Sequence, residues 1–291
     1  MKRKASHFFL AAAALLALGG TSLWGCPLAY VINFSGQFGL MDLATGQFTP
    51  IGKGLDNVPE ALGGKAGGPF YSVDGLTGRL IRIGLDGKTT EVGDTHTGPN
   101  VGPTGISLIG SLSDGTLYAL DFSNRLYRIN TETAATTPVG SLLFSLPQQE
   151  LEYSGNMTTS LTGDGKLLYY TIEILDGPRK TSPTLYIIDP VTLSVTARPL
   201  KNHPSLIIGS GIVNGVFYLF GAGGEIWTLN TGTGETKLTA RYDSSFEDGP
   251  PLTGVFGVIS AVEPNAQPLA AKDAALQPAA ARSHWPRSWK R

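Results

Sequence analysis

Charged residues are scarce in this sequence: Asp, Glu, Lys and Arg make up 15% of the 291 residues, against roughly a quarter in an average soluble domain. The formal net charge is -1, so no broad positive field is available to hold a phosphate backbone. Nucleic acid is therefore not expected as a partner. A single cysteine excludes a disulfide within the chain.

Glycine and proline, by contrast, are plentiful, with 38 and 19 copies. A chain with many turn residues and few charges suits packed sheets joined by tight turns better than long charged helices. The length is enough for one large all-β domain or for two smaller domains. The composition therefore predicts an all-β fold.

The N-terminal residues combine a basic start with a short apolar run. Met1–Lys4 carries three basic side chains, and Phe8–Leu18 is rich in Ala and Leu but short for a membrane span. The alternative is a buried N-terminal helix, but this segment has no capping residue and no amphipathic period. We therefore expect residues 1–29 to be an export signal, and the mature protein to lie in the periplasm, outside the cell or at its envelope.

Cys26 stands at the end of Leu23-Trp24-Gly25-Cys26, which resembles the bacterial lipobox. In that motif the cysteine becomes the lipid-bearing first residue of the mature protein. Leu23 and Gly25 match the pattern, whereas Trp24 is larger than the residue usually found there. Two alternatives stay open: lipidation of Cys26 with anchorage to a membrane, or ordinary secretion with an incidental cysteine.

One unit recurs along the mature chain, and its clearest copy runs from Gly105 to Gly140. It contains four short strand candidates, labelled a, b, c and d in chain order. The turn between a and b is a dipeptide that tolerates the positive φ of a two-residue hairpin turn, and an aromatic-rich strand follows it. This turn recurs as Gly67-Gly68, Asp114-Gly115, Asp164-Gly165 and Asn214-Gly215.

Five copies cover about residues 30–52, 55–93, 102–140, 153–200 and 205–242. The first copy lacks strand a, and an apolar run at Thr253–Val262 follows the last copy without further strands of its own. A C-terminal strand that completes the first blade is how a circular propeller joins its ends without exposing a sheet edge. The sequence therefore predicts an all-β, five-bladed β-propeller, or a six-bladed one if a more degenerate copy is present. In it, Val255–Ala261 pairs with the strand that begins at Tyr30; an open solenoid or a sandwich is the alternative.

The strands of this unit, such as Leu117-Tyr118 and Leu126-Tyr127, resemble the blades of the quinoprotein-like and WD-like propellers. The resemblance covers about residues 30–262 and implies a propeller domain over that range. It is a resemblance of scaffold, because neither a Gly-His and Trp-Asp pair nor a quinone-site pattern is present. Residues 263–291 are rich in Pro and Ala and are predicted to form a disordered tail. Since propellers include enzymes and binding modules alike, the resemblance does not choose a function.

Ligand-binding residues are expected at the mouth of the central channel, on the face formed by the d to a loops and the b to c corners. The loop candidates are Glu60, Thr104, Asn156, Ser205 and Thr253, and the corner candidates are Asn33, Asp74, Asp121 and Glu173. Alternatively, Asp and Asn at strand ends bond to their own turn backbone, and we favour that role for Asp74 and Asp121.

Patterns for catalysis and metal binding are weak. Glycosidases need two carboxylates at a defined separation, and among the carboxylates of this face only Glu60 has an innermost position without a turn role. A second acid could come from Glu150, Glu152 or Glu173. The histidines His96 and His203 lie far apart in the sequence, which is a poor basis for a metal site. We therefore assign no catalytic residue, metal or cofactor.

The function predicted from these features is an exported, monomeric binding or interaction module. Its polar channel mouth would bind a small molecule, a glycan or a protein. The alternative is an extracytoplasmic propeller enzyme, such as a lactonase-like or glycan-active hydrolase or lyase. The two differ in whether two carboxylates or a metal converge at the mouth.

Overall fold

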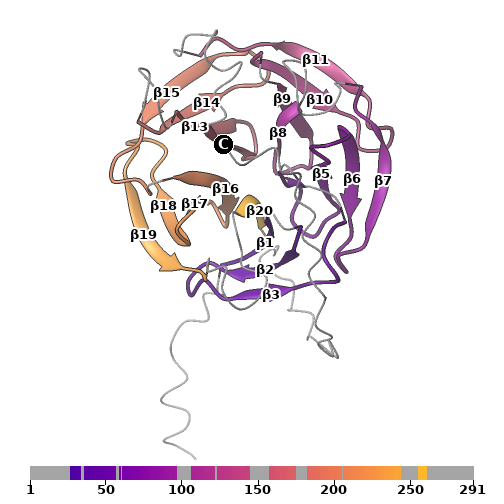
Figure 1. Ribbon diagram of the computed structural model, residues 1–291. Coiled ribbons are helices and arrows are strands. Elements are labelled where there is room, and N and C mark those ends of the chain that lie inside the picture. Colours follow the sequence, from indigo (N-terminus) through magenta and orange to yellow (C-terminus); the bar gives the residue numbers. More distant parts are fainter. Residues whose placement is uncertain are drawn as a thin grey trace, which may run out of the picture.

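The computed structural model describes residues 27–33, 36–56, 59, 61–96, 106–121, 123–144, 157–174, 182–204, 206–243 and 255–260. Within these ranges there are twenty strands and no helix, so none that could cross a membrane. Figure 1 shows the strands arranged as five blades around a common centre. Residues 1–26 of the predicted export signal, which include Cys26, and the predicted C-terminal tail lie outside the described residues. The last two residues of the predicted signal, Leu28 and Ala29, belong to a strand of the first blade.

Each blade is an antiparallel sheet of four strands, ordered a, b, c and d from the centre outward. The first consists of β20 (Val255–Ser260), β1 (Leu28–Asn33), β2 (Phe38–Asp42) and β3 (Phe48–Pro50). The second consists of β4 (Gly63–Gly64), β5 (Phe70–Val73), β6 (Arg79–Ile83) and β7 (Thr89–Asp94), and the third of β8 (Ile106–Ser111), β9 (Leu117–Asp121), β10 (Arg125–Ile129) and β11 (Thr136–Ser141). The fourth consists of β12 (Met157–Gly163), β13 (Leu168–Ile174), β14 (Thr184–Ile188) and β15 (Val195–Pro199), and the fifth of β16 (Ile207–Val213), β17 (Val216–Gly221), β18 (Glu225–Leu229) and β19 (Thr236–Arg241). The predicted all-β, five-bladed propeller is confirmed.

The first blade is completed by the last strand of the chain. β20 pairs antiparallel with β1, with Tyr30 opposite Ile259. On its other side, β20 joins β16 of the fifth blade through a parallel bridge between Ser210 and Gly257. The predicted ring closure is thus confirmed over Val255–Ser260, and β20 belongs to an eight-stranded sheet that links the fifth and first blades.

The hydrophobic core is divided among the interfaces between neighbouring blades. Five buried clusters each combine side chains from two adjacent blades, one cluster for every interface of the ring. Side chains alternate between the two faces of a strand, so each sheet contributes to two clusters. Aromatic residues of strands b and c lie in or against these clusters: Tyr71, Tyr118, Tyr170, Tyr218 and Trp227.

Serine hydroxyl groups join inner strands of neighbouring blades. Ser111 on β8 accepts a hydrogen bond from the Gly64 backbone N–H at 2.8 Å, which links the third blade to the second. Ser160 on β12 donates to Ser210 on β16 at 2.8 Å, which links the fourth blade to the fifth. All three serines are buried. These bonds add directional contacts to the apolar packing between blades, because a buried hydroxyl needs a partner.

Candidate functional site

The four corner candidates lie at equivalent places, at the ends of the b strands on one face of the propeller. Asn33 and Asp121 end their strands, Asp74 follows β5 directly, and Glu173 lies next to the end of β13. Their exposed fractions are 0% for Asn33, 5% for Asp74, 1% for Asp121 and 6% for Glu173. The structure therefore brings these residues to one face but buries their side chains.

The five loop candidates are not among the residues that the structure describes. Glu60, Thr104, Asn156, Ser205 and Thr253 all lie outside the described residues, as do Glu150 and Glu152. Their place at the channel mouth stays a prediction from the repeat.

Asp121 illustrates the contacts of a corner carboxylate. Its Oδ1 accepts the backbone N–H groups of Ser123 at 2.9 Å and Arg125 at 2.8 Å. Its Oδ2 accepts Nε of Arg125 and the hydroxyl of Tyr127, both at 3.0 Å. Burial, together with the hydrogen bond to Asp121, raises the pKa of Tyr127, which is the protonated donor in this pair. The carboxylate therefore closes its own b to c turn and holds the start of strand β10.

Two further corners use the same kind of contact. Oδ1 of Asn33 accepts the Gln37 backbone N–H at 2.8 Å, and its Nδ2 donates to Oε1 of Gln37 at 3.1 Å. Oδ1 of Asp74 accepts the Leu76 backbone N–H at 2.9 Å. Corner side chains in three blades thus bond to residues of the loop that follows them, the role we favour for Asp74 and Asp121. Ligand binding by the corners stays a prediction.

The fifth blade has Gly221 at its corner and draws a carboxylate from strand c. A Cβ built on Gly221 would lie 2.4 Å from Oε2 of Glu225, so this carboxylate fills the space of the missing side chain. Oε1 of Glu225 lies 3.5 Å from Nη1 of Arg241. Oε2 is buried and has no hydrogen-bond partner among the described residues. Glu225 is not among the residues predicted from the repeat, although it stands four residues after its corner, as Arg125 does in the third blade.

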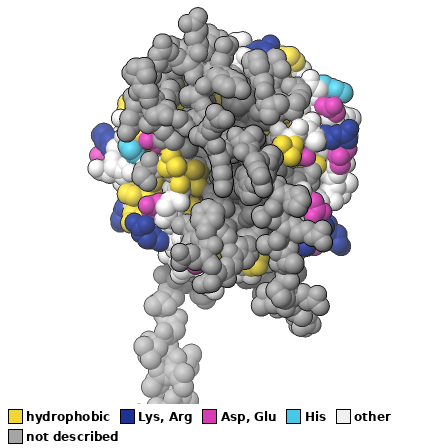
Figure 2. All heavy atoms as spheres, viewed as in Figure 1, with side chains coloured by type: hydrophobic (Ala, Val, Ile, Leu, Met, Phe, Trp, Pro, Cys, Tyr) yellow, Lys and Arg dark blue, Asp and Glu magenta, His cyan; other side chains and the backbone are white. Residues whose placement is uncertain are grey.

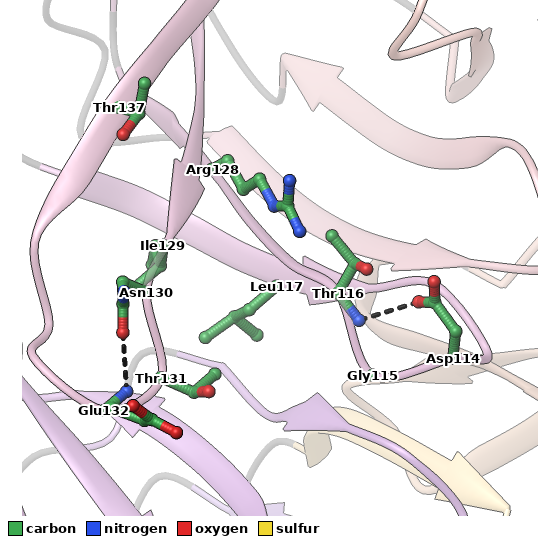
Figure 3. A pocket seen from close by; sticks show the side chains of 10 residues that line it. All are labelled: Asp114, Gly115, Thr116, Leu117, Arg128, Ile129, Asn130, Thr131, Glu132 and Thr137. Carbon is green, nitrogen blue, oxygen red and sulfur yellow. Dashed lines mark hydrogen bonds between the residues drawn. The ribbon is translucent and has the colours of Figure 1, made fainter.

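An open pocket of about 640 Å³ lies at the other end of the third blade (Figure 3). It is lined by residues 114–117 of the a to b turn, residues 128–132 of the c to d turn, and Thr137. Because successive strands run in opposite directions, these turns lie on the face opposite the corners. None of the residues predicted from the sequence to bind a ligand lines this pocket, because all of them belong to the corner face.

Two side chains shape the turns around this pocket. Oδ1 of Asp114 accepts the Thr116 backbone N–H at 2.8 Å, and Oδ1 of Asn130 accepts the Glu132 backbone N–H at 2.8 Å (Figure 3). The hydrogen bond from Thr116, assisted by the positive charge of Arg128, holds the pKa of the Asp114 carboxyl below its usual value. Asp114 is therefore an anion at neutral pH.

Charged side chains elsewhere are dispersed. In the view of Figure 2, the described Lys, Arg, Asp and Glu side chains lie mainly along the outer rim of the propeller. In the part of the chain that the structure describes, no three His, Cys, Asp or Glu side chains are grouped as metal ligands.

Comparison with known proteins gives a likeness of fold. No protein-family model matches the sequence, and no curated protein matches it. A solved protein of unknown function from Bacteroides thetaiotaomicron is 15% identical over 81% of this chain, with a TM-score of 0.51. The alignment spans 62% of that protein's length, slightly less than two thirds.

Two solved enzymes are also similar, at lower TM-scores. Virginiamycin B lyase from Staphylococcus aureus, in a catalytically inactive form with quinupristin, has a TM-score of 0.42 and 17% identity over 72% of this chain and 68% of its own. Glutaminyl cyclase from Myxococcus xanthus has a TM-score of 0.40 and 16% identity over 80% of this chain and 76% of its own. The resemblance to propellers is one of scaffold, and identities this low show the fold alone.

Proposed function

We propose that the protein is an exported binding module whose corner face binds a polar ligand at the mouth of the propeller. The observation that carries this proposal is the bonding of Asp121, whose two carboxylate oxygens accept four hydrogen bonds from the b to c turn and the start of strand β10. A general acid or base must instead reach the proton it transfers. The corner thus acts as a rigid support for the rim of the mouth, which favours binding over acid–base catalysis.

The class of ligand follows from the residues that the repeat places in the d to a loops. Thr104, Asn156, Ser205 and Thr253 are neutral hydrogen-bonding residues, and Glu60 adds one carboxylate. A concave mouth with several neutral donors and acceptors suits a ligand with many hydroxyl groups and no charge. We therefore propose a neutral oligosaccharide as the ligand.

Adding neutral oligosaccharides to the purified protein is expected to raise its melting temperature. A ligand that binds only the folded state at one hundred times its Kd stabilises that state by about 2.7 kcal/mol. Suitable probes are cellobiose, maltotriose and chitobiose, tested by thermal shift and then by calorimetry. Asn156→Ala and Ser205→Ala should each weaken binding by roughly tenfold, because each removes a ligand hydrogen bond.

Thr131→Ala is the matched control, because this threonine lies in the pocket on the opposite face. It should leave oligosaccharide affinity unchanged. If no probe shifts the melting temperature, the proposed ligand class is wrong. If a probe is cleaved and Glu60→Gln stops the cleavage, the protein is the alternative, a glycan-active enzyme.

Export predicts that the protein outside the cytoplasm is shorter than the full chain. Replacing Lys2, Arg3 and Lys4 by Glu removes the basic start of the signal and should leave uncleaved protein in the cytoplasm. Immunoblots of cell fractions measure this change. Cys26→Ala separates the two open alternatives, since it releases the protein from the membrane only if Cys26 is lipidated. Full-length protein confined to the cytoplasm of wild-type cells would contradict export.

A further inference from the structure

Arg128 brings a positive charge to the pocket of the third blade. It lies on β10, its side chain is exposed, and it extends toward Thr116 (Figure 3). Its guanidinium makes no ion pair or hydrogen bond with the other described residues; it interacts with Asp114 only through the attraction of their charges. A guanidinium without a paired carboxylate suits a ligand carboxylate, because its planar fork can donate two parallel hydrogen bonds.

The repeat does not require arginine at this position. In the b to c pairing, Arg128 lies opposite Tyr118. The second blade also has an arginine here, Arg82 opposite Tyr71. The equivalent residue is Ile187, opposite Tyr169, in the fourth blade and Thr228, opposite Tyr218, in the fifth. The fold therefore accepts an apolar or a neutral polar side chain where the third blade has Arg128.

The opposite end of the pocket is acidic. Glu132 lies in the c to d turn beside Thr131, and Figure 3 shows it at the far end of the pocket from Arg128. Glu132 makes no ion pair with the other described residues. With Asp114 included, the pocket holds one more negative than positive charge. A ligand with net negative charge is therefore disfavoured, whereas one with separated positive and negative groups matches both ends.

We infer that this pocket is a second binding site, for a short peptide with a free N-terminus and a free C-terminus. The terminal carboxylate binds Arg128, the terminal ammonium binds Glu132, and the chain between them lies in the open pocket. The volume of about 640 Å³ lies in the range of small-ligand sites and exceeds the needs of a single amino acid. The site lies on the face opposite the channel mouth, so it does not depend on the proposed oligosaccharide site.

Titration calorimetry of the full-length protein with the tripeptide Gly-Gly-Gly tests this inference. We expect binding that Arg128→Gln and Glu132→Gln each weaken by roughly tenfold or more, because each removes a charge-assisted contact. Arg82→Gln is the matched control: Arg82 lies opposite Tyr71 in the second blade, the position equivalent to Arg128, and does not line the pocket. It should leave the affinity unchanged, and all three variants should melt at the wild-type temperature.

Two blocked peptides assign each end of the ligand. The C-terminal amide of Gly-Gly-Gly should bind wild-type protein and Arg128→Gln equally, and the N-acetyl form should bind wild-type protein and Glu132→Gln equally. Absence of Gly-Gly-Gly binding, or binding that Arg128→Gln leaves unchanged, would overturn the inference. Tighter, Arg128-dependent binding of glucuronate would also overturn it, since the site would then select acidic sugars.

Discussion

A chain that ends at Asp243 is expected to lose its cooperative unfolding transition, because it lacks β20. This strand is the inner strand of the first blade and also bridges to β16 of the fifth. Without it, the backbone N–H and C=O groups on one side of β1 lose their partners, and the two ends of the ring separate. The buried cluster between the fifth and first blades, which includes Ala29 and Val31, would then be exposed to water.

Thermal melting followed by circular dichroism measures this effect. Total stabilities are only about 5–15 kcal/mol, so losing one interface of a closed ring is enough to abolish the transition. A chain that ends at Val262 is the matched control, because it keeps Val255–Ser260 and lacks only the residues predicted to form a tail. It should melt as the full chain does. A cooperative transition in the shorter chain would show that the ring holds without β20.

The closure of the ring could be predicted from the sequence because one repeat is a strand short and one strand candidate lies outside the repeats. The first repeat lacks one strand, and Thr253–Val262 is an apolar run with no partner of its own. Unpaired sheet edges at the two ends of the chain are unfavourable, so the extra C-terminal strand is expected to supply the missing strand of the first blade. The blade interfaces were predictable for a similar reason, since the tyrosines of strand b recur at equivalent positions and an aromatic residue in that setting needs to be buried.

The corner carboxylates could be located from the repeat. The residue that takes their place in the fifth blade could not. Gly221 has no side chain, and the carboxylate that fills its place comes from Glu225 on the next strand. Only the three-dimensional structure shows that the Glu225 carboxylate lies where a side chain at Gly221 would be. The sequence shows that Glu225 carries the opposite charge to Arg125 at the equivalent position, but it does not show where the Glu225 carboxylate points.

The pocket of the third blade has no signal of its own in the sequence. Its walls are two turns of a common type, and the same dipeptide turn occurs in other blades. Its charged residues, Arg128 on β10 and Glu132 in the c to d turn that follows, have counterparts of the same charge in Arg82 and Asp86 of the second blade. Whether such residues border a pocket depends on how the a to b and c to d turns face each other, and repeat spacing does not specify this.

Asp121→Ala is expected to lower the free energy of unfolding by about 2–4 kcal/mol, because it leaves several donors without an acceptor. The backbone N–H groups of Ser123 and Arg125 and the hydroxyl of Tyr127, which is buried, all lose their partner. The Arg125 side chain contributes less, since it is 45% exposed and water can replace the carboxylate. Urea denaturation at neutral pH measures the difference.

Asp114→Ala is the matched control for this prediction. Asp114 accepts the Thr116 backbone N–H in a comparable turn, but its side chain is exposed. Its loss should therefore cost only about 0.5–1.5 kcal/mol, the usual contribution of one hydrogen bond. If Asp121→Ala were as stable as wild type and instead lost oligosaccharide binding, the corner would contact the ligand directly. Loss of stability with binding retained would show that the corner carboxylate supports the rim, and that recognition belongs to the loops above it.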